Sequence, residues 1–148
     1  MNPVFLDTSG LIAVANSDDQ WHDAAEAVWH SLVESGVRLI TTSLVLVEPG
    51  DGLSRIQYRQ LALDIYGRLQ SSPRVSIIHA TPDHTERGWQ LFRHRRDKEW
   101  GVTDCVSIVV MRDWGVTEVF SSDHHFEQAG FEVLLRAEPR NRGCSLPP

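Results

Sequence analysis

Short apolar runs alternate along the chain with longer segments in which hydrophobic residues recur at helical spacing. The short runs predict five β-strands, at residues 4–6, 37–41, 75–78, 118–121 and 131–135. Among the helical segments, the one from Trp21 to Ser35 shows the clearest spacing, and Gly36 follows it as a residue suited to end a helix. Because strands alternate with helices, we expect an α/β fold with a short parallel sheet and helices on both of its faces.

Three further helices are predicted from the same periodicity, and one of them differs in character. Residues 61–69 and the segment that starts at Thr81 and Pro82 are amphipathic, as surface helices are. The helix expected over residues 103–114 is apolar nearly all round, which predicts that it is buried against the sheet.

A shorter helix is expected after the second predicted strand. Ser43 can cap an apolar helix over residues 44–47, and Pro49 and Gly50 are expected to interrupt it. This helix is expected to carry Glu48 near its end, and the helix-breaking residues that follow are expected to leave the position of Glu48 looser.

Length and composition indicate one folded domain. The chain has 148 residues, of which 41% are hydrophobic and 23% charged, as in ordinary globular proteins. We expect the domain to occupy residues 1–136. From Ala137 onward, Pro, Arg, Asn and Gly predict a loose tail over residues 137–148.

Targeting signals and cysteine usage point to the cytoplasm. No apolar run approaches the roughly 20 residues that cross a bilayer, and the N-terminus lacks a basic region followed by an apolar stretch, so no membrane partner is expected. Cys105 and Cys144 are the only cysteines, and they have neither metal-ligand spacing nor the density of a disulfide framework. A reducing cytosol is therefore the expected location.

The charge of the chain is unevenly distributed. The formal net charge is −6, which is unlike a general nucleic-acid binder. Five basic residues nevertheless fall between Arg87 and Lys98, so a local basic surface is possible despite the acidic total. The alternative is a solvated helix face with no partner.

Acidic residues follow or precede the predicted elements at positions where active sites form. In an open parallel sheet, sites lie beyond the carboxyl ends of the strands. Asp7 directly follows the first strand, and Asp123 comes shortly after the fourth. Asp104 begins the buried helix, and Glu48 follows the second strand. Each acid alone has an ordinary explanation as a cap or a turn residue, but their joint placement predicts that they converge.

Converging carboxylates favour metal-assisted hydrolysis. Mg²⁺ and Mn²⁺ prefer hard oxygen ligands, and a bound ion can activate water and neutralise charge on a phosphate. His124 and His125 are set aside as ligands because neighbouring side chains point apart and no third histidine joins them. Cys105 is interpreted as a core thiol, and burial in the core is expected for most of the tryptophans.

Four fragments resemble PIN-domain proteins, in particular the VapC-like toxins of prokaryotic toxin–antitoxin pairs. They occur in the order found in that family, at residues 5–9, 42–48, 98–105 and 122–131. The resemblance extends from about residue 1 to residue 135 and implies a three-layer sandwich with strand order 3-2-1-4-5. It also implies a metal-dependent endoribonuclease whose metal-binding, catalytic acids are Asp7, Glu48, Asp104 and Asp123.

Further roles follow from the same resemblance. Thr8, Ser9 and Thr103 are expected to support the metal site through their hydroxyl groups. The implied partners are an RNA substrate, a cognate antitoxin protein and a second copy of the chain in a homodimer. From the basic stretch between Arg87 and Lys98, independently of the resemblance, Arg93, Arg95 and Arg96 are expected to contact the RNA backbone. The RNA target and the choice between Mg²⁺ and Mn²⁺ stay open.

Two other functions compete with this interpretation. A phosphatase of the haloacid dehalogenase type also begins with a strand that ends in Asp, but it needs a second Asp at the position of Ser9. The other alternative is a catalytically silent PIN-fold module that only binds proteins. Loss of an acid would indicate it, and all four acids are present.

Overall fold

The computed structural model describes residues 2–136, apart from the side chain of Asp51. Five parallel strands form one sheet: β1 (Val4–Leu6), β2 (Leu39–Thr42), β3 (Val75–Ile78), β4 (Glu118–Phe120) and β5 (Glu132–Val133). Their order across the sheet is β3-β2-β1-β4-β5, as the family resemblance implied. The tail predicted over residues 137–148 lies outside the described residues.

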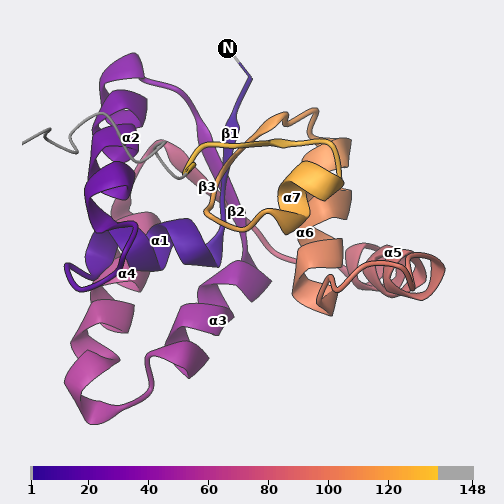
Figure 1. Ribbon diagram of the computed structural model, residues 1–148, viewed down its shortest axis with the longest axis horizontal. Coiled ribbons are helices and arrows are strands. Elements are labelled where there is room, and N and C mark those ends of the chain that lie inside the picture. Colours follow the sequence, from indigo (N-terminus) through magenta and orange to yellow (C-terminus); the bar gives the residue numbers. More distant parts are fainter. Residues whose placement is uncertain (1, 137–148) are drawn as a thin grey trace, which may run out of the picture.

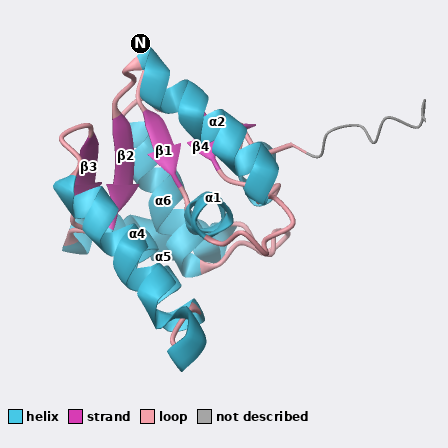
Figure 2. Ribbon diagram, turned by 90° about the vertical axis from the view of Figure 1, so that its left-hand side faces the viewer, coloured by secondary structure: helices cyan, strands magenta, loops and turns pink. Residues whose placement is uncertain are grey.

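Helices cover both faces of the sheet, which confirms the predicted architecture. One face carries α1 (Thr8–Ala15), α2 (His22–Ser35) and α4 (Arg59–Ser71), which lie in front of the sheet in Figure 2. The other face carries α5 (Pro82–His94) and α6 (Val102–Asp113), on the right in Figure 1. The remaining helices are α3 (Ser43–Gly52), the 3-10 turn η1 (Ile56–Tyr58) and α7 (His125–Gln128).

The core is centred on β1 and α6. All three residues of β1 are buried between β2 and β4, since helices cover the strand on both faces. Residues 105–111 of α6 are likewise all buried, which confirms the prediction made from its nearly uniform apolar composition. Asp7 follows β1 and Asp104 lies in the first turn of α6, so both acids stand at the ends of elements in the core.

Gly10 allows α1 to lie directly against the end of β4. A Cβ atom at this position would be 2.3 Å from the carbonyl oxygen of Phe120, far inside contact distance. Because no larger residue fits, the absence of a side chain brings the start of α1 close to the segment that follows β4. Those two segments carry Asp7 and Asp123.

The predicted end of α3 was wrong. The helix continues through Pro49 to Gly52 instead of stopping near residue 47. A proline cannot donate a hydrogen bond to the carbonyl four residues earlier, here that of Val45. The hydroxyl of Thr8 in α1 lies 3.4 Å from this carbonyl oxygen, but its single proton points to the closer Oε2 atom of Glu48 at 2.6 Å. Glu48 therefore lies inside a helix.

Two predicted helix starts also need correction. Thr42, rather than Ser43, precedes α3, and its hydroxyl accepts the backbone N–H of Val45 at 3.2 Å. Helix α6 begins at Val102 after Gly101, so Thr103 is its second residue instead of its first. In both cases the helix begins one residue earlier than the sequence pattern indicated.

Burial was predicted incorrectly for two tryptophans. Trp89 is 53% exposed and Trp114 is 45% exposed. Helix α5 approaches α6 through Gly88, where an added Cβ would be 2.5 Å from Val106 Cγ2. The neighbouring Trp89 is turned about 100° away around the helix and faces outward. None of the helices between residues 2 and 136 is long and apolar enough to cross a membrane.

Candidate active site

Asp7 lies between β1 and α1, with its side chain held by hydroxyl groups. Its Oδ2 atom accepts hydrogen bonds from the backbone N–H and the hydroxyl of Ser9, at 3.3 and 3.1 Å. The hydroxyl of Ser121 donates to the same oxygen at 2.8 Å. All these donors address Oδ2, so Oδ1 accepts no hydrogen bond from the described part of the chain.

Burial makes the charge of Asp7 unfavourable in the metal-free protein. The residue is only 6% exposed, and this desolvation raises the pKa of its carboxyl group from 3.8 to about 6. The negative charge of Asp104 raises the pKa further, whereas the hydrogen bonds from Ser121 and Ser9 lower it. A carboxylate in this position is stabilised by a nearby cation.

Glu48 is oriented by a residue of α1. The hydroxyl of Thr8 donates a hydrogen bond of 2.6 Å to Glu48 Oε2. This contact joins α1 to α3 and holds the carboxylate close enough for its charge to raise the pKa of Asp104. Thr8 thus contacts one of the predicted acids, and its support of a metal site stays a prediction.

Asp104 stands in the first turn of α6, and the charges of two other acids raise the pKa of its carboxyl group. Its Oδ2 atom accepts the backbone N–H of Gly101 at 2.9 Å, which is a capping contact. Burial raises the pKa of Asp104, and so do the charges of Asp123 and Glu48, against the lowering effect of the Gly101 N–H. The predicted acids thus come together around Asp104.

Ser121 joins two of these acids and was missed in the sequence. Besides donating to Asp7, its oxygen accepts the backbone N–H of Asp123 at 3.0 Å, and it lies 2.9 Å from the hydroxyl of Ser9. The side chain is fully buried. Its place at the end of the fourth strand, two residues before Asp123, is the signal that could have identified it.

His125 also lies in the acidic cluster, contrary to its interpretation from the sequence. Its ligand atom and those of Asp104 and Asp123 all lie within 4.8 Å of one another. His124 is exposed, although the two imidazole rings are only 4.8 Å apart between centroids. The assumption that neighbouring side chains point apart overlooked that one member of the pair is enough to reach the acids.

The whole domain matches a known protein family. The family model of the PIN domain covers residues 4–132. The chain belongs to the PIN domain family. It is 30% identical over 135 residues to the 23S rRNA-specific endonuclease VapC20 of Mycobacterium tuberculosis, over 91% of this chain and 99% of the relative.

Solved structures agree with this membership. The crystal structure of Mycobacterium tuberculosis VapC20, described as a Sarcin-Ricin loop cleaving toxin, matches the PIN domain with a TM-score of 0.78 at 28% identity. That match covers 86% of this chain and 95% of the other. VapBC2 from Rickettsia felis, bound to a promoter DNA fragment, has a TM-score of 0.65 at 16% identity over 88% of this chain and 96% of that one.

The donor set of the PIN-domain site suits a hard divalent cation. It offers carboxylate oxygens, which Mg²⁺ and Mn²⁺ prefer, and includes the Oδ1 atom of Asp7 that carries no hydrogen bond from the described residues. It also contains a buried nitrogen, His125 Nδ1, that has no hydrogen-bond partner there. Buried polar atoms without partners are rare, so this nitrogen fits a site that binds a cation.

Two of the three hydroxyl residues expected to support the metal site contact its acids. Ser9 and Thr8 bond to Asp7 and Glu48, whereas no hydrogen bond of the Thr103 side chain occurs within residues 2–136, so its role stays a prediction. Cys105 is fully buried, and desolvation raises the pKa of its thiol to about 11, as expected of a core cysteine.

The basic segment before Asp104 is partly neutralised. Arg95 donates to Asp97 at 3.0 and 3.1 Å and lies over the ring of Trp100, 5.2 Å from its centroid. Arg93 and Arg96 form no ion pair with any described residue. These two arginines are the members of the predicted set with freely available charge.

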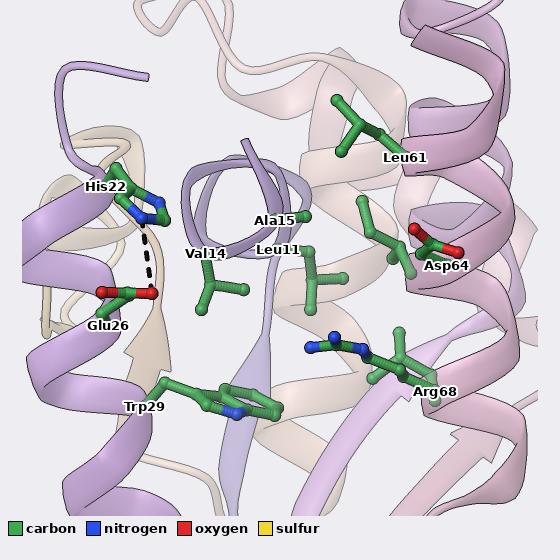
Figure 3. A pocket seen from close by; sticks show the side chains of 11 residues that line it. Leu11, Val14, Ala15, His22, Glu26, Trp29, Leu61, Asp64 and Arg68 are labelled. Atoms are coloured by element: carbon green, nitrogen blue, oxygen red, sulfur yellow. Dashed lines mark ion pairs between the residues drawn. The ribbon is translucent and has the colours of Figure 1, made fainter. Parts of the chain in front are cut away.

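A separate pocket lies between α1, α2 and α4. It has a volume of about 260 Å³, and Leu11, Val14 and Ala15 of α1 face Trp29 of α2 and Leu61 of α4 across it (Figure 3). An ion pair of 3.4 Å between His22 and Glu26 lies at one side (Figure 3). None of the predicted metal-binding acids lines this pocket.

Proposed function

We propose that this PIN domain is a metal-dependent endoribonuclease. Its metal-binding and catalytic residues are Asp7, Glu48, Asp104 and Asp123. The observation that carries the proposal is the convergence of charge on Asp104, whose pKa is raised by Asp123 and Glu48 and which in turn raises the pKa of Asp7. An RNA phosphodiester is itself an anion, so this cluster binds it only when a cation offsets the repulsion.

The residues of the site divide the work. A bound Mg²⁺ or Mn²⁺ supplies an activated water and neutralises charge on the phosphate during hydrolysis. Ser9 and Ser121 hold one oxygen of Asp7 and leave the other free to bind the ion. Thr8 orients Glu48, and the Gly101 N–H orients Asp104, so the ligands are positioned before the ion arrives.

The relatives suggest the biological setting. Because VapC20 is named as a 23S rRNA-specific endonuclease and a toxin, we propose that this chain is the toxin of a toxin–antitoxin pair and acts on RNA in the cytoplasm. Its proposed partners are a cognate antitoxin and a second copy of itself. A catalytically silent binding module is disfavoured, since all four acids are present and each of the other three interacts electrostatically with Asp104.

Cleavage of RNA by the purified protein tests this function. We expect single-stranded or looped RNA to be cut in Mg²⁺ or Mn²⁺ and left intact in EDTA, because the ion supplies the activated water. The products should carry a 5′-phosphate, since water attacks rather than the 2′-hydroxyl of the RNA. End-labelling of the products identifies the phosphate.

The matched control is Asp18→Asn, which removes an exposed acid whose side chain accepts no hydrogen bond within residues 2–136. It should cleave RNA like the wild type, whereas Asp7→Asn should not. Cleavage that continues in EDTA, or a 2′,3′-cyclic phosphate on the product, contradicts the proposed mechanism.

The basic segment supplies a second prediction, on RNA binding. Changing Arg93, Arg95 and Arg96 to Gln should weaken binding and flatten its salt dependence, by about 0.7 in the log–log slope per lost phosphate contact. Most of the change should come from Arg93 and Arg96, because Arg95 is already paired with Asp97. Binding measured between low and moderate salt gives the slope.

Arg38→Gln is the control for this experiment, because Arg38 is exposed and directly precedes β2, at the end of the sheet away from the acids. It should leave the slope unchanged. If the triple variant binds with unaltered affinity and slope, the segment is a solvated face or contacts a protein.

A further inference from the structure

One nitrogen at the acidic site lacks a partner in the fold. The Nδ1 atom of His125 is shielded from solvent and forms no hydrogen bond within residues 2–136. It lies 3.1 Å from Asp123 Oδ1 and 3.9 Å from Asp104 Oδ2. The shorter contact lacks hydrogen-bond geometry, and Asp123 Oδ1 already accepts the backbone N–H of His125 at 2.9 Å. The lone nitrogen therefore faces two carboxylates without a proton bridge.

These separations are short enough for one small ion to contact all three groups. Ligands at right angles around an octahedral ion with bonds of about 2.1 Å are about 3 Å apart, and opposite ligands about 4.2 Å. The observed 3.1 Å to Asp123 is close to the first value, and the 3.9 Å to Asp104 lies between the two. In the tautomer with its proton on Nε2, His125 presents the lone pair of Nδ1 to the carboxylates, and a cation between the three groups would remove that repulsion.

The two elements that carry these groups are tied together. The indole N–H of Trp100, in the loop before α6, donates to Gln128 Oε1 of α7 at 3.0 Å. Trp100 is almost fully buried, and the same loop leads directly into Asp104. His125 at the start of α7 is thereby held next to Asp104 whether or not an ion is bound.

We propose that His125 Nδ1 is a ligand of the divalent ion beside Asp104 and Asp123, and that this nitrogen makes the site select Mn²⁺ over Mg²⁺. The inference rests on the metal site of the proposed function. Mg²⁺ retains oxygen ligands and is held by carboxylates and waters, whereas imidazole suits transition-metal ions. Mn²⁺ combines acceptance of a nitrogen ligand with a preference for carboxylate oxygens.

Pulsed electron paramagnetic resonance of bound Mn²⁺ tests the ligand directly. The wild-type spectrum should show coupling of Mn²⁺ to an imidazole ¹⁴N nucleus. His125→Asn, which places an amide group where Nδ1 stands, should lose this coupling. His124→Asn is the matched control: it changes the exposed neighbouring histidine and should keep the coupling.

Calorimetric titration of the same proteins with each metal measures the selectivity. The Kd for Mn²⁺ should rise about tenfold or more in His125→Asn, as expected when a group at a metal site is lost. The Kd for Mg²⁺ should change by less than about threefold, since an oxygen donor can replace the nitrogen. Thermal midpoints in EDTA establish that each variant is folded.

Two outcomes overturn the proposal. If wild-type Mn²⁺ shows no ¹⁴N coupling, His125 is an ion-pair partner of Asp123 rather than a ligand. If His125→Asn changes the Kd of both metals by the same factor, the nitrogen does not select between them. The proposed function fails differently: nitrogen coupling without RNA cleavage contradicts the ribonuclease activity alone, and cleavage without coupling contradicts only the role of His125.

Discussion

Replacing Asp104 with Asn is expected to reduce metal-dependent RNA cleavage by more than about a hundredfold, the upper range for groups that only support a metal ligand. The charges of both Asp123 and Glu48 act on Asp104, so this acid stands at the centre of the cluster. The neutral amide keeps the shape of the side chain but loses the charge that binds the cation. Initial cleavage rates of wild type and variant at saturating Mg²⁺ measure the loss.

The same substitution should not destabilise the metal-free protein. Burial and the neighbouring acids raise the pKa of Asp104, which means that its charged form is disfavoured in the fold. Asn removes the charge, and its amide oxygen can still accept the Gly101 N–H. We therefore expect the thermal midpoint in EDTA to stay the same or rise.

Added Mg²⁺ should stabilise the wild type much more than the Asp104→Asn variant. A ligand that binds only the folded state stabilises it by about 2.7 kcal/mol at a hundredfold excess over Kd. This gain should appear in the wild type and shrink sharply in Asp104→Asn. If the variant has a clearly lower midpoint in EDTA and keeps the full Mg²⁺ shift, Asp104 acts as a helix cap and the four-acid site is wrong.

Mild acidification should stabilise the metal-free wild type, because the pKa of Asp7 is about 6 in the fold and 3.8 in a free side chain. Between these values, the unfolded chain releases the proton of Asp7 while the folded protein still binds it. The free energy of unfolding therefore falls as pH rises from about 4 to 6. At 1.36 kcal/mol per pKa unit, the total is about 3 kcal/mol.

Asp7→Asn is the reference for this effect, since it cannot titrate. The difference in unfolding free energy between wild type and variant, measured in EDTA from pH 4 to pH 7, should change by about the predicted amount in favour of the variant. Mg²⁺ should oppose the trend, because a cation competes with protons for the carboxylates. A difference that does not vary with pH would mean that Asp7 is solvated and ionised in the fold.

Local sequence patterns were enough to predict much of the secondary structure. Buried strands and amphipathic helices have distinct periodicities, so β1, β3, α2 and α4 could be located from neighbouring residues alone. The strand order was available only through the family resemblance, because short apolar runs do not specify which strands pair. Helix ends differed from the prediction by a residue or more at α3 and α6, and both helices begin one residue earlier, at capping contacts of Thr42 and Gly101.

By itself, the sequence determined the alternation of elements and the positions of the acids at their ends, because these depend on residues close together along the chain. Only the tertiary structure decided which groups meet. Ser121 reaches Asp7 across 114 positions, and Thr8 reaches Glu48 across 40 positions. His125 likewise comes close to Asp104 where Trp100, in the loop before α6, donates to Gln128 of α7. Such contacts arise from packing between distant segments, and no local periodicity records them.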